Sequence, residues 1–393
     1  MEIITRFRQK KLISLYFFIV SLDSISFSFL GPVLAPLLAQ HSGFFGEIAS
    51  PFLQYMMYGL VISLFPLVYA FSSPLLGSLS DRWGRKPVVL ACLAMTFLGF
   101  LSYGLAFYFS SVALLLIGRV FAGVGCASEC IAQAAVMDIV DPAVKPQAVS
   151  LIAIAMTMGL LFGPLIASIW TEYSSFYIFS FIIVWIIVAI VVLGRASVGA
   201  VSVRETQAPA WHFLWHNTAV KRGLFVFLLF ELGWSLYFQT LPLALSIHWQ
   251  QGHSSVGLIA SGIGAALIFF LFTATRIGLR LTSSRQLIRV GLWLGIVAFV
   301  ANMLMPSLLL FTLYAVPIVL AVALIYPCLI ANLSDLSEGH HGFIIGVAGT
   351  LLSFSFALSG FLSSLMIYVD YRLPFLVACL CWIDALFCAK IRN

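Results

Sequence analysis

Long apolar stretches separated by short polar ones run along almost the whole chain. Each stretch holds roughly 20 or more mostly apolar residues, the length that a helix needs to cross the hydrocarbon core of a bilayer. We therefore predict twelve membrane-spanning helices, near residues 12–38, 52–76, 87–108, 110–137, 146–170, 174–194, 223–247, 255–275, 286–305, 307–331, 343–367 and 371–389. Little chain remains for a separate soluble domain.

The composition excludes a water-soluble globule. Hydrophobic residues make up 62% of the chain and charged residues only 9%, so no polar exterior can be assembled from the available side chains. All seven cysteines fall inside the predicted spans, where neither a disulfide framework nor a zinc site is expected; they are Cys92, Cys126, Cys130, Cys328, Cys379, Cys381 and Cys388. We expect them to be packing residues, and we expect no metal and no cofactor.

The basic residues indicate how the chain is oriented in the membrane. Arg6, Arg8, Lys10 and Lys11 precede the first apolar stretch, which is about twice as long as the apolar part of a signal peptide and is therefore predicted to be a retained helix. With twelve helices and both termini on one side, 18 of the 20 basic residues lie on the side of the termini. That side is predicted to be cytoplasmic. The net charge of +6 then reflects orientation, and nucleic-acid binding is not expected.

The longest polar interval divides the spans into six and six. We predict an amino-terminal bundle over residues 1–194, a cytoplasmic linker over 195–222 and a carboxy-terminal bundle over 223–393. Asp23 in the first helix has a counterpart in Glu231 of the seventh, which suggests internal duplication. Duplicated six-helix halves are typical of transporters, because a site at their interface can be exposed to either side in turn.

The stretch GSLSDRWGRKPVVL joins the second and third predicted helices. An ordinary positive-inside loop explains its basic residues but does not require its acid or its glycines, which we expect to allow close helix packing at Gly77 and a tight turn at Gly84. The stretch resembles the loop motif of the major facilitator superfamily at Gly77, Leu79, Asp81, Arg82, Gly84, Arg85 and Lys86. LDSISFSFLGPVLAPLL and IGRVFAGVGCASECIAQAAVMDIVD are similar to the first and fourth helices of its tetracycline-type proton antiporters. The carboxy-terminal half follows by topology.

This resemblance implies an all-α membrane fold of two pseudo-symmetric six-helix bundles, in which the loop acts as a conformational latch. We expect Asp81 near the positive amino end of the helix that begins near Gly342, and we expect Arg85 to pair with Asp138 at the end of helix 4. Each contact is worth on the order of 1 kcal/mol, which biases two states without freezing either. The latch is predicted to stabilise the outward-facing state.

Five ionisable side chains lie at membrane depth: Asp23, Arg119, Glu129, Glu231 and Asp384. Each costs roughly 2.5 to 3.5 kcal/mol to insert, so each is a candidate functional residue. Asp23 is the strongest candidate proton carrier, because a desolvated carboxyl group can exchange a proton when its surroundings change. The resemblance implies that Arg119 influences the protonation of a nearby acid, which we expect to be Asp23. The alternative is a permanent structural ion pair between these two residues.

The other acids carry different expectations. Glu129 is predicted to be a substrate contact or a second proton site, and Glu231 a functional acid. Asp384 lies in the twelfth helix, where a structural role is favoured. The tetracycline antiporters carry further charged groups in helices 3, 8 and 9, whereas helix 9 here offers only Asn302. Tetracycline is therefore not the predicted substrate.

Helix 5 contains GLLFGPLIAS, which resembles the antiporter motif at Gly159, Gly163 and Pro164. Ala167 and Ser168 replace the glycines expected next, and such small residues still allow helices to approach closely. The motif favours export, although the replacements weaken that inference.

Three polar side chains are predicted to line a substrate cavity: Tyr237, Gln239 and Tyr326. His248 and His253 are expected to be surface residues of the loop between helices 7 and 8.

These observations predict a secondary transporter that moves a small organic compound by alternating access, most simply as a proton-coupled exporter. One alternative is a proton-coupled importer of a nutrient, metabolite or siderophore-like chelate. Another is a membrane sensor that does not transport, which the costly buried charges argue against. Nucleotide loops, nucleophile elbows and metal spacings are absent from the sequence, so an enzyme is not expected. The predicted location is the bacterial inner membrane, where one twelve-helix chain suffices as a functional monomer.

Overall fold

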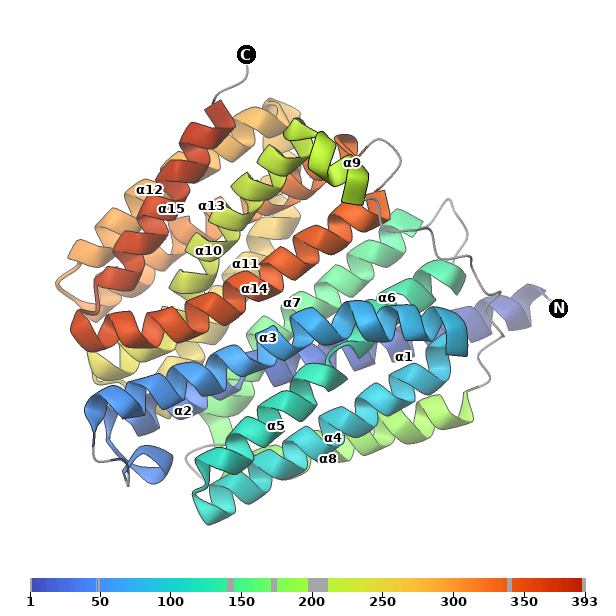
Figure 1. Cartoon of the computed structure of the whole chain (residues 1–393), viewed down its shortest axis with the longest axis horizontal. Helices are drawn as coiled ribbons and strands as arrows, with labels where there is room; N and C mark the ends of the chain where they lie inside the picture. The colour runs from blue at the N-terminus through green and yellow to red at the C-terminus, as the bar shows by residue number, and fades with distance from the viewer. Residues whose placement is uncertain are drawn as a thin grey trace. The chain divides into compact units, whose positions relative to one another are not determined.

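The computed structural model describes residues 2–46, 48, 50–139, 145–170, 175–196, 211–337 and 341–390. All regular structure in these ranges is helical (Figure 1). The elements are α1 (Glu2–Ser28), α2 (Leu30–Ala39), the short 3₁₀ helix η1 (Gly43–Phe45), α3 (Pro51–Trp83), α4 (Arg85–Phe109), α5 (Val112–Gly125), α6 (Ser128–Ile139), α7 (Lys145–Trp170), α8 (Ser175–Arg195), α9 (Trp211–His216), α10 (Thr218–Ile247), α11 (His253–Leu281), α12 (Ser284–Leu304), α13 (Leu308–Asp335), α14 (His341–Val369) and α15 (Leu373–Lys390).

The apolar spans match those predicted from the sequence. In the described ranges, ten segments are long and apolar enough to cross a membrane. Two shorter apolar helices, Ile154–Ile169 within α7 and Leu373–Ala389 within α15, complete the set of twelve. The predicted all-α membrane fold is therefore confirmed.

The first predicted span is built from two helices rather than one. The sequence predicts a single helix over residues 12–38, but α1 ends at Ser28 and α2 begins at Leu30. Pro32 has no N–H group to donate to the carbonyl oxygen of Ser28, so the helical ladder is interrupted there.

The fourth predicted span, residues 110–137, is also divided, between α5 and α6. At the division the N–H of Ala127 donates to the carbonyl oxygen of Val124 at 3.2 Å, and the N–H of Glu129 donates to that of Cys126 at 3.0 Å. Both bonds reach back three residues instead of four, which tightens the backbone and changes the direction of the chain. The division places Ser128 and Glu129 in the first turn of α6.

The chain forms two compact units. The first comprises Met1–Ala49, Leu64–Gln207 and His253–Ser261, and the second comprises Ser50–Ser63, Ala208–Gly252 and Gly262–Asn393. Helices α3 and α11 therefore each contribute residues to both units. The predicted boundaries at 1–194, 195–222 and 223–393 stay a prediction, and residues 197–210 of the predicted linker lie outside the described residues.

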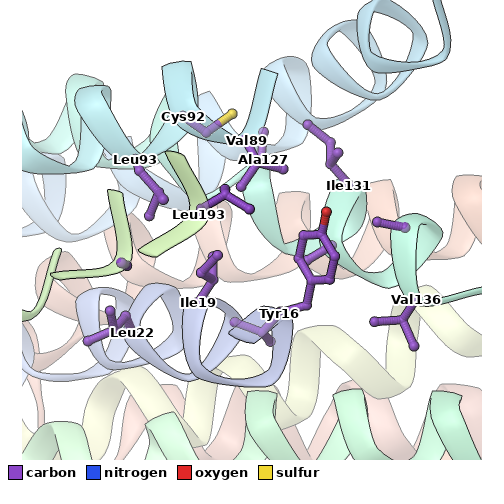
Figure 2. Packing of buried hydrophobic residues seen from close by; sticks show 14 of the residues in the cluster. Tyr16, Ile19, Leu22, Val89, Cys92, Leu93, Ala127, Ile131, Val136 and Leu193 are labelled. Carbon is purple, nitrogen blue, oxygen red and sulfur yellow. The ribbon is translucent and has the colours of Figure 1, made fainter. Parts of the chain in front are cut away.

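In the first unit α1 packs against α6 and α7, while α4 packs against α5 and α8. A cluster of buried side chains from α1, α4, α6 and α8 fills the space between them, and Figure 2 shows Tyr16, Ile19, Val89, Ile131 and Leu193 among its members. In a bilayer such packing, rather than exclusion from water, holds helices together. The cluster fixes the faces that α1 and α6 present to each other.

In the second unit α10 packs against α14 and α15, and α12 packs against α13 and α15. Trp382 is fully buried at the centre of this packing. Its Nε1 donates to the carbonyl oxygen of Phe230 at 3.0 Å, and its ring stacks on the Phe230 ring with centroids 5.5 Å apart. A Cβ atom added at Gly233 or Gly295 would overlap the indole, so these glycines make the room that it occupies.

We expect Gly295→Ala to destabilise the protein, because the buried Trp382 ring cannot move aside without disturbing two helices. Overpacking of this kind costs about 1–3 kcal/mol. Thermal unfolding in detergent measures the effect. Gly262→Ala in α11 is the matched control, since a Cβ there meets no atom within 4 Å, and equal melting temperatures for the two variants would contradict the prediction.

Candidate functional site

Asp23 is fully buried on α1 and is held by neutral groups. The hydroxyl of Ser128, the first residue of α6, donates to its Oδ2 atom, and Thr96 of α4 also interacts with the carboxyl group. Its Oδ1 atom has no hydrogen-bond partner among the residues that the structure describes. The permanent ion pair between Asp23 and Arg119, the alternative that the sequence leaves open, is neither shown nor excluded by these contacts and stays a prediction.

Glu129 follows Ser128 in the first turn of α6 and is 8% exposed. The thiol of Cys126 donates to its Oε2 atom at 3.7 Å. Tyr69 of α3 and Ser24 of α1 also interact with its carboxyl group. All these partners are neutral, as are those of Asp23.

The structure thus brings Asp23 and Glu129 together, close enough for their charges to interact. The arrangement is reciprocal: Asp23 accepts from Ser128, the neighbour of Glu129, while Glu129 interacts with Ser24, the neighbour of Asp23. In the sequence these residues appear only as two separate dipeptides, Asp23-Ser24 and Ser128-Glu129. The division between α5 and α6 places the two dipeptides opposite each other. We call Asp23, Ser24, Ser128 and Glu129 the acid cluster.

Arg119 lies on α5 and is 1% exposed. Its guanidinium carbon stands 4.7 Å above the centre of the Phe65 ring, and the Tyr103 side chain lies near enough for the two groups to interact. A buried guanidinium over an aromatic face is stabilised by the ring quadrupole. Its predicted influence on the protonation of Asp23 stays a prediction.

Helix α7 approaches α1 at the level of Asp23. The hydroxyl of Ser28 donates to the carbonyl oxygen of Gly159 at 2.6 Å. A Cβ atom at Gly159 would overlap Ser24, and one at Gly163 would overlap the Ser28 hydroxyl. Pro164 follows within the same helix. The glycines therefore bring the two backbones together beside the acid cluster, as small residues do between membrane helices.

The charged loop centres on Arg85, which is 7% exposed although it begins α4. Its Nε donates to Oδ2 of Asp138 at 3.1 Å. Its Nη1 donates to Ser80 at 2.7 Å and lies 2.6 Å from Oδ1 of Asp81. Gly84 precedes it with φ +92°, a conformation that glycine adopts without strain. The ion pair with Asp138 that the sequence predicts is present, while its role as a latch stays a prediction.

The remaining motif residues have other surroundings. Lys86 turns away from the ion pair, and its Nζ donates to the carbonyl oxygens of Gly194 at 2.8 Å and Ala196 at 2.7 Å, at the end of α8. Arg82 is exposed. A Cβ atom at Gly77 would meet nothing within 4 Å in the described ranges, so Gly77 is not the close-packing position that the sequence suggests. The expected contact between Asp81 and the helix near Gly342 stays a prediction.

In the second unit Glu231 is 1% exposed on α10, and within the described part of the chain its Oε2 has no hydrogen-bond partner. Tyr237 is fully buried among aromatic rings, 5.7 Å from Phe299 and 5.9 Å from Phe375 between centroids. Asp384 is exposed on α15. The fold thus repeats a buried acid in the second unit without repeating the cluster of neutral donors.

The other predicted cavity residues are less enclosed than Tyr237. Gln239 donates from Nε2 to the carbonyl oxygen of Phe356 at 3.4 Å. Tyr326 lies beside Phe227, with ring centroids 6.3 Å apart. Their role in binding a substrate stays a prediction.

The predicted surface histidines differ from each other. His248 is exposed, and its ring stacks on Tyr371 with centroids 3.6 Å apart. Partial burial and the nearby charge of Arg372 lower its pKa. His253 begins α11 and is half-buried.

A family model described as Major Facilitator Superfamily matches residues 16–360. The chain belongs to this superfamily. It is therefore an integral membrane protein of a transporter family, as the loop motif predicts. Within the superfamily, the tetracycline resistance protein of class C from Escherichia coli is 32% identical over 147 residues, which cover 37% of this chain and 34% of that protein. The chain thus spans about a third of the length of this curated relative.

Solved structures of the superfamily share the fold along nearly the whole chain. The human organic anion transporter MFSD10 (TETRAN) superposes with a TM-score of 0.72 at 18% identity, covering 97% of this chain and 99% of that one. A D-xylose-proton symporter superposes with a TM-score of 0.75 at 13% identity, covering 97% and 98%. At these identities the likeness shows the fold alone.

Replacing Lys86 with Ala removes the donor for two carbonyl groups at the end of α8. We expect a loss of about 1 kcal/mol, because a lysine there caps free carbonyls and complements the helix dipole. Thermal unfolding and hydrogen exchange over residues 190–196 measure the change. Arg82→Ala removes the same charge from an exposed position, and an equal effect of both variants would contradict the assigned cap.

Proposed function

We propose that this transporter exports a small organic compound in exchange for protons, with Asp23 and Glu129 as the proton-exchanging groups of the first unit. The observation that carries the proposal is the acid cluster, in which the hydrogen-bonding partners described for the two buried carboxyl groups are all neutral. A buried carboxylate without a cation beside it is costly. Uptake of a proton removes that cost, and release restores it.

The neutral donors suit such an exchange. Ser128 donates to Asp23, and a hydroxyl group can instead accept when the carboxyl group carries a proton. Both charge states of Asp23 therefore keep a hydrogen bond, whereas a fixed arginine would favour only the charged state. Glu129 is 8% exposed and Asp23 is fully buried. We assign Glu129 to the outer position of the cluster, where a proton or a compound arrives first.

Two observations support export over import. The backbone contact of α7 with α1 through Gly159 and Gly163 corresponds to the helix 5 motif of antiporters. The tetracycline resistance protein that matches 37% of the chain is named for drug resistance. The replacement of later motif glycines by Ala167 and Ser168 keeps the importer as the second candidate. This chain shares its fold with the D-xylose-proton symporter, which is compatible with that second candidate.

The proposed setting is a bacterial inner membrane with both termini in the cytoplasm, which follows from the distribution of basic residues. There the ion pair of Arg85 and Asp138 forms the cytoplasmic latch. The compound and protons are the proposed partners, and one chain is the proposed functional unit.

Flux in reconstituted vesicles under an imposed pH gradient tests the function. We expect labelled organic compounds to move against the proton flow. We expect Asp23→Asn or Glu129→Gln to reduce this coupled flux at least about tenfold, because the amide cannot take up or release a proton. A free-energy difference of about 1.4 kcal/mol between the protonated and charged states already corresponds to a factor of ten. Asp384→Asn is the control, since it changes an exposed acid on α15. Movement in the direction of the protons would favour the importer. Wild-type flux in Asp23→Asn and Glu129→Gln, singly and combined, would rule out coupling through these two acids.

The latch has its own test. We expect Asp81→Asn to shift the exposure of reporter cysteines toward the inward-facing state, because it removes one of the two carboxylates that neutralise Arg85. Alkylation rates from each side of the membrane measure the shift. Asp370→Asn, in the loop between α14 and α15, is the control. Unchanged exposure in Asp81→Asn would count against a latch.

A further inference from the structure

The end of α11 and the beginning of α12 concentrate positive charge. Between Glu231 and Asp335 the sequence has no Asp or Glu residue, and its only Lys or Arg residues are four arginines within residues 276–289. Helix α11 ends and α12 begins inside the second unit. Three of these arginines have side chains that the structure describes, and we call them the arginine group: Arg280, Arg285 and Arg289.

The arginine group has no partner in the parts of the chain that the structure describes. Two of its members are exposed, and Arg289 is half-buried. Among the described residues, none of the three guanidinium groups forms a salt bridge or a hydrogen bond. The corresponding loop of the first unit is different, because there Asp81 and Asp138 neutralise Arg85. The second unit has the basic residues of this loop without the acids.

Contacts between the two helices hold the arginine group together. A Cβ atom added at Gly278 of α11 would lie 2.8 Å from the Leu287 side chain of α12. The Thr282 hydroxyl donates to the side-chain oxygen of Gln286, and the Ser283 hydroxyl accepts from the backbone N–H of Gln286 as the N-cap of α12. The last turn of α11 and the first turns of α12 are thus in contact, which puts their arginines at the same end of the second unit.

An exposed apolar face continues from the arginines along α12. Residues at four-residue intervals lie on neighbouring turns of one side of a helix, and here they are Arg285, Arg289, Trp293 and Val297. Trp293 is 58% exposed and Val297 is 62% exposed, within the apolar span Ser284–Leu304. Trp293 lies about 12 Å from Arg285 along the helix axis. Helix α12 thus presents positive charge and then apolar surface, which is the order of headgroup and acyl chains in a phospholipid.

The charge of the arginine group distinguishes between kinds of phospholipid. A guanidinium group binds a phosphate through two parallel hydrogen bonds, and every phospholipid headgroup contains a phosphate. A zwitterionic headgroup also brings an ammonium group, which needs an acid beside the arginines. Asp335, the acid that ends α13, forms no salt bridge with the arginine group within the described ranges. An anionic headgroup brings no ammonium group, so its charge complements the site.

We propose that the arginine group binds the phosphate of an anionic phospholipid, whose acyl chains lie along Trp293 and Val297. The lipid comes from the leaflet beside this loop, on the side predicted to be cytoplasmic. The alternative is that the arginines only orient the chain during insertion, and they would then show no preference for a headgroup. The proposal concerns a lipid site on the second unit and does not depend on the direction or coupling of transport.

Native mass spectrometry of the detergent-purified protein tests this site, with phosphatidylglycerol and phosphatidylcholine of the same acyl chains as the two probes. We expect the wild-type protein to bind phosphatidylglycerol at least about tenfold more tightly, because each basic residue near an anionic headgroup contributes a factor of about five. The combined variant with Arg280→Gln, Arg285→Gln and Arg289→Gln should bind both lipids equally. Equal binding of the two lipids by the wild-type protein would overturn the proposal.

A second combined variant removes the same charge elsewhere. Lys11→Gln, Arg195→Gln and Lys221→Gln replace three exposed basic residues near the ends of other spans, and this variant should keep the preference for phosphatidylglycerol. An equal loss in both combined variants would show a general effect of net charge and refute the assigned site. Arg285→Gln alone should lower the preference about fivefold. That single change measures the site should the combined variant fail to fold, and an unaltered preference would count against the proposal.

Two further measurements separate the headgroup from the acyl chains and from free phosphate. Trp293→Ala should weaken the binding of both lipids to the same extent, because the ring contacts acyl chains only. A loss confined to phosphatidylglycerol would contradict this arrangement. Inorganic phosphate at millimolar concentration should leave the lipid bound, since it has no acyl chains. Displacement of the lipid by phosphate would identify a site for soluble anions instead of a lipid site.

Discussion

The hydrogen bond from Ser128 to Asp23 is the constraint on which the first unit is arranged. A carboxyl group at this depth needs a donor, and the apolar helices around it offer few. Ser128 supplies one because α5 ends and α6 begins just before it, which turns the first residues of α6 toward α1. The close approach of α7 through its glycines then encloses the other side of α1. The divided span and the close helix contact thus both surround and position the buried acid Asp23.

In the charged loop, on the side proposed to be cytoplasmic, polar contacts likewise determine how the helices are arranged. Arg85 and Lys86 are neighbours in sequence, yet Arg85 reaches two carboxylates while Lys86 reaches the end of α8. The beginning of α4 is thereby tied to α3, α6 and α8 at once. If the ion pair opens and closes as the proposed latch requires, the contacts of Lys86 would hold the beginning of α4 in place during that change. Under that proposal the motif supplies both a contact that changes and one that stays fixed.

The sequence predicts much of this arrangement, but not all of it, for reasons that are physical. Hydropathy gives the twelve spans because length and apolarity alone decide which helices can cross a bilayer. The pairing of Arg85 with Asp138 was predictable because both lie in motifs at known helix ends. The partnership of Asp23 with Glu129 was not, because it depends on the rotation of α6 relative to α1 after a local tightening of the backbone. Lys86 likewise donates to carbonyl groups 108 and 110 residues away. Because every residue has a backbone carbonyl group, the sequence cannot indicate which ones accept these bonds.

Asp23 and Glu231 occupy corresponding places in the two halves, but their surroundings differ. Asp23 has a hydroxyl donor and a second acid beside it. Oε2 of Glu231 finds no hydrogen-bond partner in the ranges that the structure describes, and the neighbouring turns of α10 pack aromatic rings. A group whose two charge states both find partners can change charge at little cost. A group without partners changes charge only when water or a compound reaches it. Duplication is consistent with a buried acid in each half. Under the proton exchange proposed above, the local donors favour Asp23 as the group that changes charge in every cycle, whereas Glu231 would depend on what enters the second unit.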